Sequence, residues 1–517
     1  MSLLFRRVML AVLTFVWLAP VCRADVKLPA IIGNHMVLQR EMPLPIWGWA
    51  AAGEEVTVAV GDHKATTKAA DDGKWLVKLP PLKGGAPVEM TITGKNTIKL
   101  TDILVGEVWV GSGQSNMQWS VNAVDNAQQE IAAANHPGIR LFSVPLVPAG
   151  VPANDVQASW QVCSPQTIAG FSAVAYFFGR EIHKTLNVPV GMIATSWGGT
   201  RIEPWIPPLG FLSEKDLGQE LQALKQAKVN YAHALGEWAR QVQSWAAAAE
   251  KAAPELGDPS PMPPPPQHPL NNNSTPTGLY NGMVHALVPF AIRGALWYQG
   301  ESNRGQGMHY HSLMKGLISG WRGVWGQGEF PFLFVQLAPY RYDQNFTALP
   351  EIWEAQTATL AVPNTGMAVT TDISNVKDIH PRNKQEVGRR LALWALAKTY
   401  NKPDVVYSGP QYASLAVQQG EVQIKFHHAE GGLIARDDKP LTWFTIAGDD
   451  KKFVPAVARI ANDTVVVSSP QVPAPVAVRF AWHQIAEPNL ANKAGLPAIP
   501  FRTDNWTDAK ADNPEVR

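Results

Sequence analysis

Apolar and polar residues alternate in short runs over the first hundred positions, which is the period of strands with one buried face. Turn residues separate these runs at intervals of roughly ten positions, a spacing typical of a β-sandwich. We therefore predict a β-sandwich-like domain over residues 25–100, which serves either as a spacer or as a carbohydrate-binding module. The clearest runs cover residues 36–38, 45–49, 56–60, 74–79 and 88–93.

Continuous apolar runs replace this alternation between residues 101 and 403. Such runs, bounded by glycine and polar residues, are expected of strands buried in a parallel sheet. Apolar residues also recur with helical spacing over 176–184 and 384–400. Strands that alternate with helices predict an α/β domain. The predicted strands cover residues 103–110, 139–144, 190–195, 292–298, 331–337 and 367–371.

The α/β pattern is interrupted by an insertion at residues 211–270. Leucine and aromatic residues recur from Leu217 to Trp245 mostly in alternating steps of four and three, as in the a/d seam of a helix. The seam predicts either one helix of about 40 Å or a helical hairpin that turns near Gly236. The proline-rich residues 259–269 are expected to be extended. Accessory packing, substrate guidance and dimerisation are all open roles for this insertion.

Both ends of the chain differ from the α/β region. Residues 404–517 return to alternating runs and predict a C-terminal β-rich region. At the N-terminus, two arginines precede an apolar run over residues 8–18, and residues 22–24 form a small-x-small cleavage pattern. This is the composition of a signal peptide over residues 1–24. An uncleaved anchor is disfavoured because the run is short for a membrane span. We expect a periplasmic or secreted mature protein outside the membrane.

Charge and cysteine content exclude several classes of function. The chain has 44 basic and 43 acidic side chains, and loss of the leader removes three arginines and no acid, which leaves 41 against 43. A formal charge of −2 does not favour nucleic acid or an anionic membrane as a partner. Cys163 is the single cysteine outside the leader, so it has no partner for an internal disulfide and no companion cysteine for a metal site.

Three polar glycine turns follow three of the predicted strands. They cover residues 111–117, 196–200 and 299–303, and the first contains Ser115. Because the carboxyl ends of parallel strands lie along one edge of a sheet, the three turns are expected to meet there. Ser115 is then either a nucleophile, which needs a base, or a capping residue in a glycine turn. The other two turns are candidates for donors to an oxyanion.

His380 is the candidate base, because imidazole titrates near neutral pH. Asp378 is the candidate acid that orients the imidazole, and Asp372 and Glu301 are its rivals. The alternatives are that His380 is a surface residue before a proline and that Asp378 caps the helix that follows.

Four sequence blocks resemble the sialate O-acetylesterase family of SGNH-type hydrolases. They are GQSNM, SWGGT, WYQGESN and DIHP, at residues 113–117, 196–200, 297–303 and 378–381. The resemblance implies an α/β fold with a flavodoxin-like three-layer SGNH-hydrolase domain, flanked here by the β-rich regions. It also implies removal of O-acetyl groups from sugar hydroxyls through an acetyl-enzyme, with no metal and no organic cofactor.

Carried onto this sequence, the resemblance implies that Ser115 is the nucleophile and His380 the base. The backbone of Gly199, with Gln299 or Asn303, would form the oxyanion hole.

The sequence departs from the family pattern at the acid. Many SGNH-type hydrolases place it three residues before the histidine, and that position is Lys377 here, with Asp378 one residue later. The acid therefore remains open between Asp378, Asp372 and Glu301.

We therefore predict an exported carbohydrate O-acetylesterase whose partner is an O-acetylated sugar. The sugar is either sialic acid, for which Arg201 is a candidate carboxylate partner, or a fragment of acetylated xylan, xyloglucan or pectin. A non-catalytic carbohydrate-binding protein is the alternative of another class, suggested by the two β regions and the 19 tryptophans. The sequence carries no signal on oligomeric state.

Overall fold

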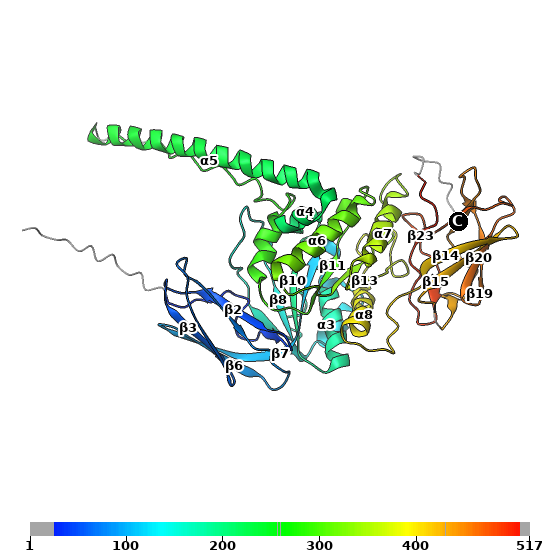
Figure 1. The fold of residues 1–517 in the computed structure, drawn as a ribbon, viewed down its shortest axis with the longest axis horizontal. Helices are drawn as coiled ribbons and strands as arrows, with labels where there is room; N and C mark the ends of the chain where they lie inside the picture. The colour runs from blue at the N-terminus through cyan, green and yellow to red at the C-terminus, as the bar shows by residue number, and fades with distance from the viewer. Residues whose placement is uncertain (1–24, 256, 259, 430, 507–517) are drawn as a thin grey trace, which may run out of the picture.

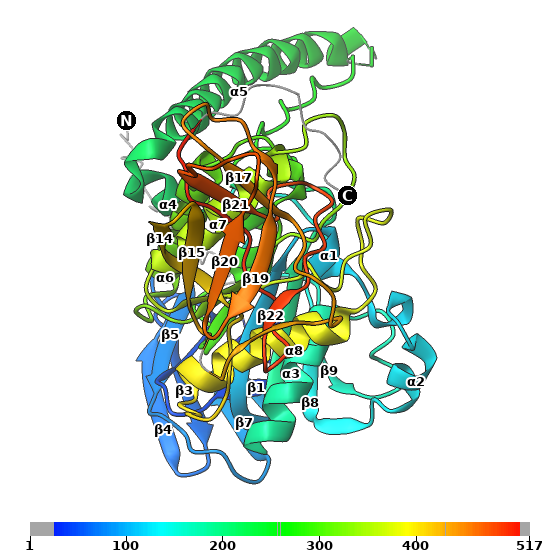
Figure 2. The ribbon, with the colours of Figure 1, turned by 90° about the vertical axis from the view of Figure 1, so that its right-hand side faces the viewer.

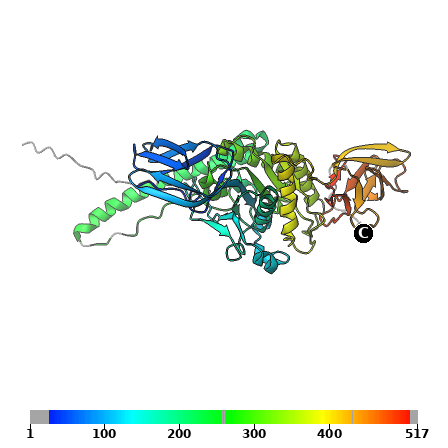
Figure 3. The ribbon, with the colours of Figure 1, turned by 90° about the horizontal axis from the view of Figure 1, so that it is seen from below.

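The computed structural model describes residues 25–255, 257–258, 260–429 and 431–506, so the predicted leader lies outside the described residues. An α/β region occupies the middle of the molecule, with one β region on each side of it (Figures 1 and 3). A long helix, α5, extends away from the body.

Several N-terminal strands alternate between buried and more exposed positions, as their sequence predicts. β5 is the clearest case, with every second side chain buried. β3 pairs with β4 and β6, and β2 pairs with β5, all antiparallel. The strands are β1 (Val37–Gln39), β2 (Leu44–Trp49), β3 (Glu55–Val60), β4 (His63–Lys68), β5 (Lys74–Leu79) and β6 (Val88–Thr93).

One strand joins this region to the α/β region. β7 (Thr97–Gly113) pairs with β6 near its start and enters the central sheet in its second half. The predicted boundary after residue 100 therefore lies inside a continuous strand. Apolar side chains of the two regions also belong to one buried cluster, which makes the N-terminal strands an extension of the α/β core.

The central sheet has the strand order β13-β12-β11-β7-β10-β8-β9. Its neighbouring strands are parallel except for the last pair, β8 and β9, which is antiparallel. The prediction of an α/β architecture around a parallel sheet is confirmed. The remaining strands are β8 (His136–Ser143), β9 (Trp160–Cys163), β10 (Val190–Ser196), β11 (Gly294–Tyr298), β12 (Phe332–Val335) and β13 (Thr365–Ala368).

Helices cover the sheet in two groups (Figures 1 and 2). The first group is α3 and α8, which pack on each other and on the strands; the second is α4, α6 and α7. β11 and β12 are wholly buried between them. The helices are α1 (Ser115–Gln118), α2 (Ala127–Ala132), α3 (Ala173–Leu186), α4 (Pro208–Ser213), α6 (His309–Trp325), α7 (Ala348–Ala358) and α8 (Lys384–Trp394).

The insertion forms one unbroken helix, α5 (Gly218–Ala252), about 52 Å long at the usual rise. Gly236 lies inside it, so the hairpin alternative is wrong. The proline-rich segment runs back along the helix and contacts the aromatic side chains of the predicted a/d seam. Nε1 of Trp238 donates to the carbonyl of Pro263 over 2.9 Å, for example. Within the described ranges, no helix combines the length and apolar character needed to cross a bilayer.

The C-terminal region has a hydrophobic core of its own, separate from that of the α/β region. It contains two four-stranded antiparallel sheets, β14-β15-β20-β19 and β18-β17-β21-β23, and the pair β16-β22. The strands are β14 (Gln411–Gln418), β15 (Glu421–His427), β16 (Leu433–Ala435), β17 (Phe444–Ala447), β18 (Val454–Pro455), β19 (Val457–Ala461), β20 (Thr464–Ser468), β21 (Ala477–Phe480), β22 (Leu490–Asn492) and β23 (Phe501–Arg502).

Candidate active site

The three glycine turns leave the central sheet at the same level. Gly113, the last residue of β7, is paired with Ser196 on one side and with Tyr298 on the other. Gly113 has a φ of 139°, and a Cβ there would lie 2.1 Å from the carbonyl oxygen of Tyr298. Only glycine fits this close approach. The strand therefore ends in a tight turn, and Ser115 starts the short helix α1 directly behind it.

Ser115 and His380 are brought together across 265 positions of sequence. Oγ of Ser115 lies 2.9 Å from Nε2 of His380, which is hydrogen-bond distance. His380 sits in the loop between β13 and α8. The ring of Trp119 stacks on the imidazole, with centroids 4.7 Å apart and planes 16° apart. Sequence reasoning missed Trp119, although its position one helical turn after Ser115 was an available signal.

The surroundings of His380 favour its neutral, proton-accepting form. Partial burial lowers the pKa of His380 below its ordinary value of 6.5, and the positive charge of Lys384 lowers it further. Asp378 acts in the opposite direction. A neutral imidazole next to a serine hydroxyl is the protonation state that a general base requires.

The structure separates the three candidate carboxylates. Oδ1 of Asp378 lies 3.9 Å from Nδ1 of His380 and also accepts the backbone N–H of His380 over 2.9 Å. Asp372 instead forms a two-bonded ion pair with Arg390, at 2.6 and 2.7 Å. Glu301 accepts a hydrogen bond from Asn116. Of the three, Asp378 is the carboxylate within ion-pair distance of the imidazole, and its 3.9 Å separation is too long for a direct hydrogen bond to Nδ1.

The second glycine turn runs directly against the nucleophile. A Cβ on Gly198 would lie 3.3 Å from Cβ of Ser115, and the N–H of Gly198 donates to Gln118 over 2.8 Å. Gly199 has a φ of 75° and faces open space. Among the described residues, the N–H groups of Ser115 and Gly199 have no acceptor. These two amides are free to receive a negatively charged oxygen.

The third turn supplies buried amides that the fold already uses. Nε2 of Gln299 donates to the carbonyl of Thr200 at 3.1 Å and to Oδ1 of Asn303 at 2.7 Å. Nδ2 of Asn303 donates to Glu203 at 3.0 Å and to Gln306 at 2.8 Å. Gln299 thus supports the end of the second turn, and Asn303 supports the residues that follow it. Either one must release a protein acceptor before it can donate to an oxyanion.

A family model described as carbohydrate esterase, sialic acid-specific acetylesterase, matches residues 105–236 and 270–397, about half of the chain. The sialate O-acetylesterase of Rattus norvegicus is 31% identical, with 88% of this chain and 89% of that protein covered. The chain therefore belongs to the sialic acid-specific acetylesterase family of carbohydrate esterases. The Homo sapiens sialate O-acetylesterase is 30% identical, with 92% of both chains covered.

A solved structure of a relative agrees with this assignment. The crystal structure of a carbohydrate acetylesterase from Xanthomonas citri is 34% identical, covers 93% of this chain and 100% of its own, and superposes with a TM-score of 0.78. The chain is therefore a carboxylic ester hydrolase, and its relatives support carbohydrate O-acetylesterase activity. The family model omits residues 237–269, which are the outer part of α5 and the proline-rich segment.

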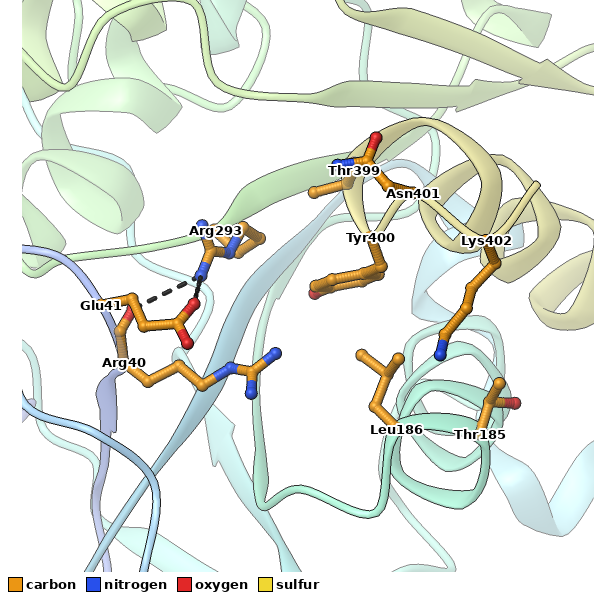
Figure 4. Close-up of a pocket in the computed structure, with 9 residues that line it drawn as sticks. All are labelled: Arg40, Glu41, Thr185, Leu186, Arg293, Thr399, Tyr400, Asn401 and Lys402. Carbon is orange, nitrogen blue, oxygen red and sulfur yellow. Dashed lines mark hydrogen bonds and ion pairs between the residues drawn. The ribbon is translucent and has the colours of Figure 1, made fainter.

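Two clefts of the esterase lie away from Ser115. One, of about 420 Å³, is lined by residues that follow β1, end α3, precede β11 and follow α8 (Figure 4). Behind it the buried Glu107 pairs with Arg40 and Arg293, which joins the N-terminal strands to the sheet. The other, of about 800 Å³, lies at the base of α5 beside His309. The first cleft lies where the N-terminal strands join the central sheet. Neither cleft is lined by Ser115 or His380.

Proposed function

We propose that the esterase removes O-acetyl groups from sugar hydroxyls through an acetyl-enzyme formed on Ser115. The observation that carries the proposal is the 2.9 Å contact between Oγ of Ser115 and Nε2 of His380 at the carboxyl edge of the sheet. Ligands of open α/β sheets bind at this edge. Asp378 is the acid of the proposed triad, because it is the candidate carboxylate that lies against Nδ1 of His380.

In the first half-reaction, Nε2 of His380 accepts the Ser115 proton while Oγ bonds to the acetyl carbon. The carbonyl oxygen becomes an oxyanion, for which the free N–H groups of Ser115 and Gly199 are suitable donors. Gln299 and Asn303 could donate to the oxyanion only after breaking a present hydrogen bond, such as that of Gln299 to Asn303 or that of Asn303 to Glu203. Collapse of the intermediate breaks the bond to the sugar oxygen, which takes the proton from His380.

Water completes the reaction by the reverse roles. His380 removes a proton from water, whose oxygen bonds to the acetyl carbon. The second intermediate then releases Oγ of Ser115, which regains its proton from His380, and acetate leaves. Each proton transfer in this scheme passes through His380, and the proton that the sugar oxygen takes is replaced by one from water.

The finer fold assignment and the location of the enzyme belong to the same proposal. The central domain, residues 101–403, is of the flavodoxin-like SGNH type, with the insertion at 211–270 and β-sandwich-like flanks at 25–100 and 404–517. Residues 1–24 act as a cleavable leader, so the mature enzyme is periplasmic or secreted. N-terminal sequencing of the enzyme recovered from the periplasm or medium tests this, and a start well before residue 25 would contradict it.

The substrate is proposed to be either an acetylated sialic acid or a neutral acetylated plant oligosaccharide. The relatives' names favour sialate. The surroundings of Arg201 favour a neutral sugar, because its Nη2 and Nε are engaged by Glu203 at 2.6 and 3.3 Å. That ion pair neutralises the charge that a sialate carboxylate would need.

Acetate release from a panel of acetylated sialic acid and acetylated xylan, xyloglucan and pectin fragments tests both parts of the proposal. Replacement of Ser115 by alanine should abolish release from every substrate, and a serine-directed phosphonate should label the wild type at Ser115. Unchanged turnover in the Ser115→Ala variant would refute the mechanism. Sugar binding with no turnover and no labelling would favour the non-catalytic alternative.

A further inference from the structure

A chain of buried polar side chains lies directly behind the nucleophile–base pair, which we define as Ser115 and His380. Lys384, the first residue of α8, donates from Nζ to Oδ1 of Asn116 over 2.5 Å. Nδ2 of Asn116 donates to Oε1 of Glu301 over 2.6 Å. Lys384 and Asn116 are 0% and 1% exposed. The proposed mechanism uses none of these three side chains.

The amide of Asn116 connects both halves of the nucleophile–base pair. It follows Ser115 in the chain, and its Nδ2 also donates to the carbonyl of Ile379, the residue before His380, over 3.0 Å. The orientation of the amide is determined, because Lys384 has only donors to offer and the carbonyl of Ile379 only accepts. A flipped amide would place its NH₂ group against the ammonium and leave its oxygen facing acceptors.

The charges in this chain are costly for the fold. An ammonium without solvent exposure loses its hydration, and burial accordingly lowers the pKa of Lys384 to about 7. Glu301 and Asp378 oppose that shift, and the ring of Tyr298 lies 5.3 Å from Nζ. Buried ion pairs are often no more stabilising than apolar side chains of the same volume. Stability therefore does not by itself account for a lysine at this place.

We propose that Lys384, Asn116 and Glu301 are positioning residues that hold the nucleophile–base pair in hydrogen-bonding register. The three residues come from α8, α1 and the third glycine turn, so one hydrogen-bonded chain ties together the elements that carry the reaction. This inference rests on the proposed catalytic roles of Ser115 and His380 and extends them to the side chains behind.

The charge of Lys384 has a second effect, on the base. The groups that face His380 are the hydroxyl of Ser115, the neutral ring of Trp119, the carboxylate of Asp378 and, from α8, Lys384. Lys384 and burial lower the pKa of His380, and Asp378 raises it. Loss of the lysine charge should therefore raise the pKa of His380 and move the acid limb of kcat/KM to higher pH.

The primary test is Lys384→Met in the full-length enzyme, assayed by acetate release from the best substrate of the panel across a range of pH. A displacement of reacting groups by about 1 Å costs about 100-fold in rate, so we expect kcat to fall by about 10- to 100-fold. KM should change less than about twofold, because none of the three residues is proposed to contact the sugar. The acid limb should move upward. A matched control is Lys377→Met, which removes an exposed lysine from the same loop and should leave kcat and the pH profile unchanged.

Two substitutions of Glu301 distinguish a positioning role of this side chain from a merely structural one. Glu301→Gln keeps an oxygen that can accept from Asn116, whereas Glu301→Ala removes it. The glutamine variant should therefore retain most of the kcat that the alanine variant loses. If Lys384→Met fails to fold because Glu301 is left as an unpaired buried charge, the double variant Lys384→Met with Glu301→Gln removes both charges and should still show the lowered kcat.

The outcomes distinguish this inference from the proposed function. Wild-type turnover in Ser115→Ala would overturn the mechanism itself. An inactive Ser115→Ala together with wild-type kcat and pH profile in a folded Lys384→Met or Asn116→Ala variant would overturn the positioning network and leave the mechanism standing. Equal losses in Glu301→Gln and Glu301→Ala would also count against positioning. Circular dichroism and thermal melting establish that each variant is folded.

Discussion

Replacement of Asp378 by asparagine is the most direct probe of the acid behind His380. The substitution keeps the size of the side chain and an oxygen able to accept the backbone N–H of His380, which Oδ1 accepts over 2.9 Å. It removes only the negative charge that lies 3.9 Å from Nδ1 of the imidazole. Any change in rate therefore reports the stabilisation of the protonated imidazole that forms in the transition state.

The geometry sets the expected size of this effect. Unit charges 4 Å apart interact by about 1 kcal/mol in water and about 4 kcal/mol near a protein surface. The Asp378 side chain is 41% exposed, so solvent screening places the value near the lower end, at about 1–2 kcal/mol. This corresponds to a fall in kcat of about 5- to 30-fold. In a fully buried triad the same change costs about 10⁴-fold.

The assay is steady-state acetate release by Asp378→Asn, with thermal melting in parallel. Asp372→Asn is the contrasting variant. It breaks an ion pair with Arg390 whose partners are 6% and 5% exposed, which should lower stability by about 3–5 kcal/mol. A loss of 10³-fold or more in Asp378→Asn would refute the open, screened geometry of the acid. Wild-type activity would remove Asp378 from the mechanism and return Asp372 and Glu301 as candidates.

Three further results are expected. Gly113→Ala should abolish activity and lower stability, because its Cβ would lie 2.1 Å from a backbone carbonyl oxygen. Gly199→Ala, whose Cβ meets open space, should cost only about 1 kcal/mol of backbone strain. Equal effects of the two variants in melting and acetate-release assays would contradict this reasoning. The acid limb of kcat/KM should have its midpoint below pH 6.5, since His380 must be neutral and its pKa lies below that ordinary value. A midpoint above pH 6.5 would contradict the assignment. Trp119→Ala should lower kcat/KM by about 2- to 13-fold, because the ring that stacks on His380 is lost. Trp119→Phe keeps a stacking ring and should retain most of the wild-type kcat/KM. Equal losses in both variants would show that ring stacking is not the cause.

Sequence periodicity was a good guide to single elements. The alternation over residues 74–79 and the apolar run over 190–195 both predict strands that the structure contains as β5 and β10. Periodicity reports how one element is buried, which is a local property. It was a weaker guide at Gly236, where a glycine in a helical seam is compatible both with a turn and with the continuous helix α5. Contacts with the returning proline-rich segment accompany the continuous helix.

In the active site, too, local sequence patterns predicted some features, and others depended on contacts between distant elements. A parallel sheet was sufficient to predict that Ser115 and His380, which both follow strands, lie at one edge, and the 2.9 Å contact in the structure agrees with that expectation. The engagement of Gln299 and Asn303 in bracing bonds was not accessible from their residue types, because either amide is chemically able to serve an oxyanion. Only the positions of neighbouring acceptors show how each N–H is used.

Local patterns and blocks of adjacent residues were enough to indicate the α/β architecture, the family, and the nucleophile and base candidates. Tertiary structure decided which carboxylate lies against His380, which amides are free, and that Lys384 reaches Asn116 behind the nucleophile. The physical reason is that hydrogen bonds and charge interactions depend on distances of a few ångströms between elements that are distant in the chain. Those distances are set by how the strands and helices pack, which no local pattern records.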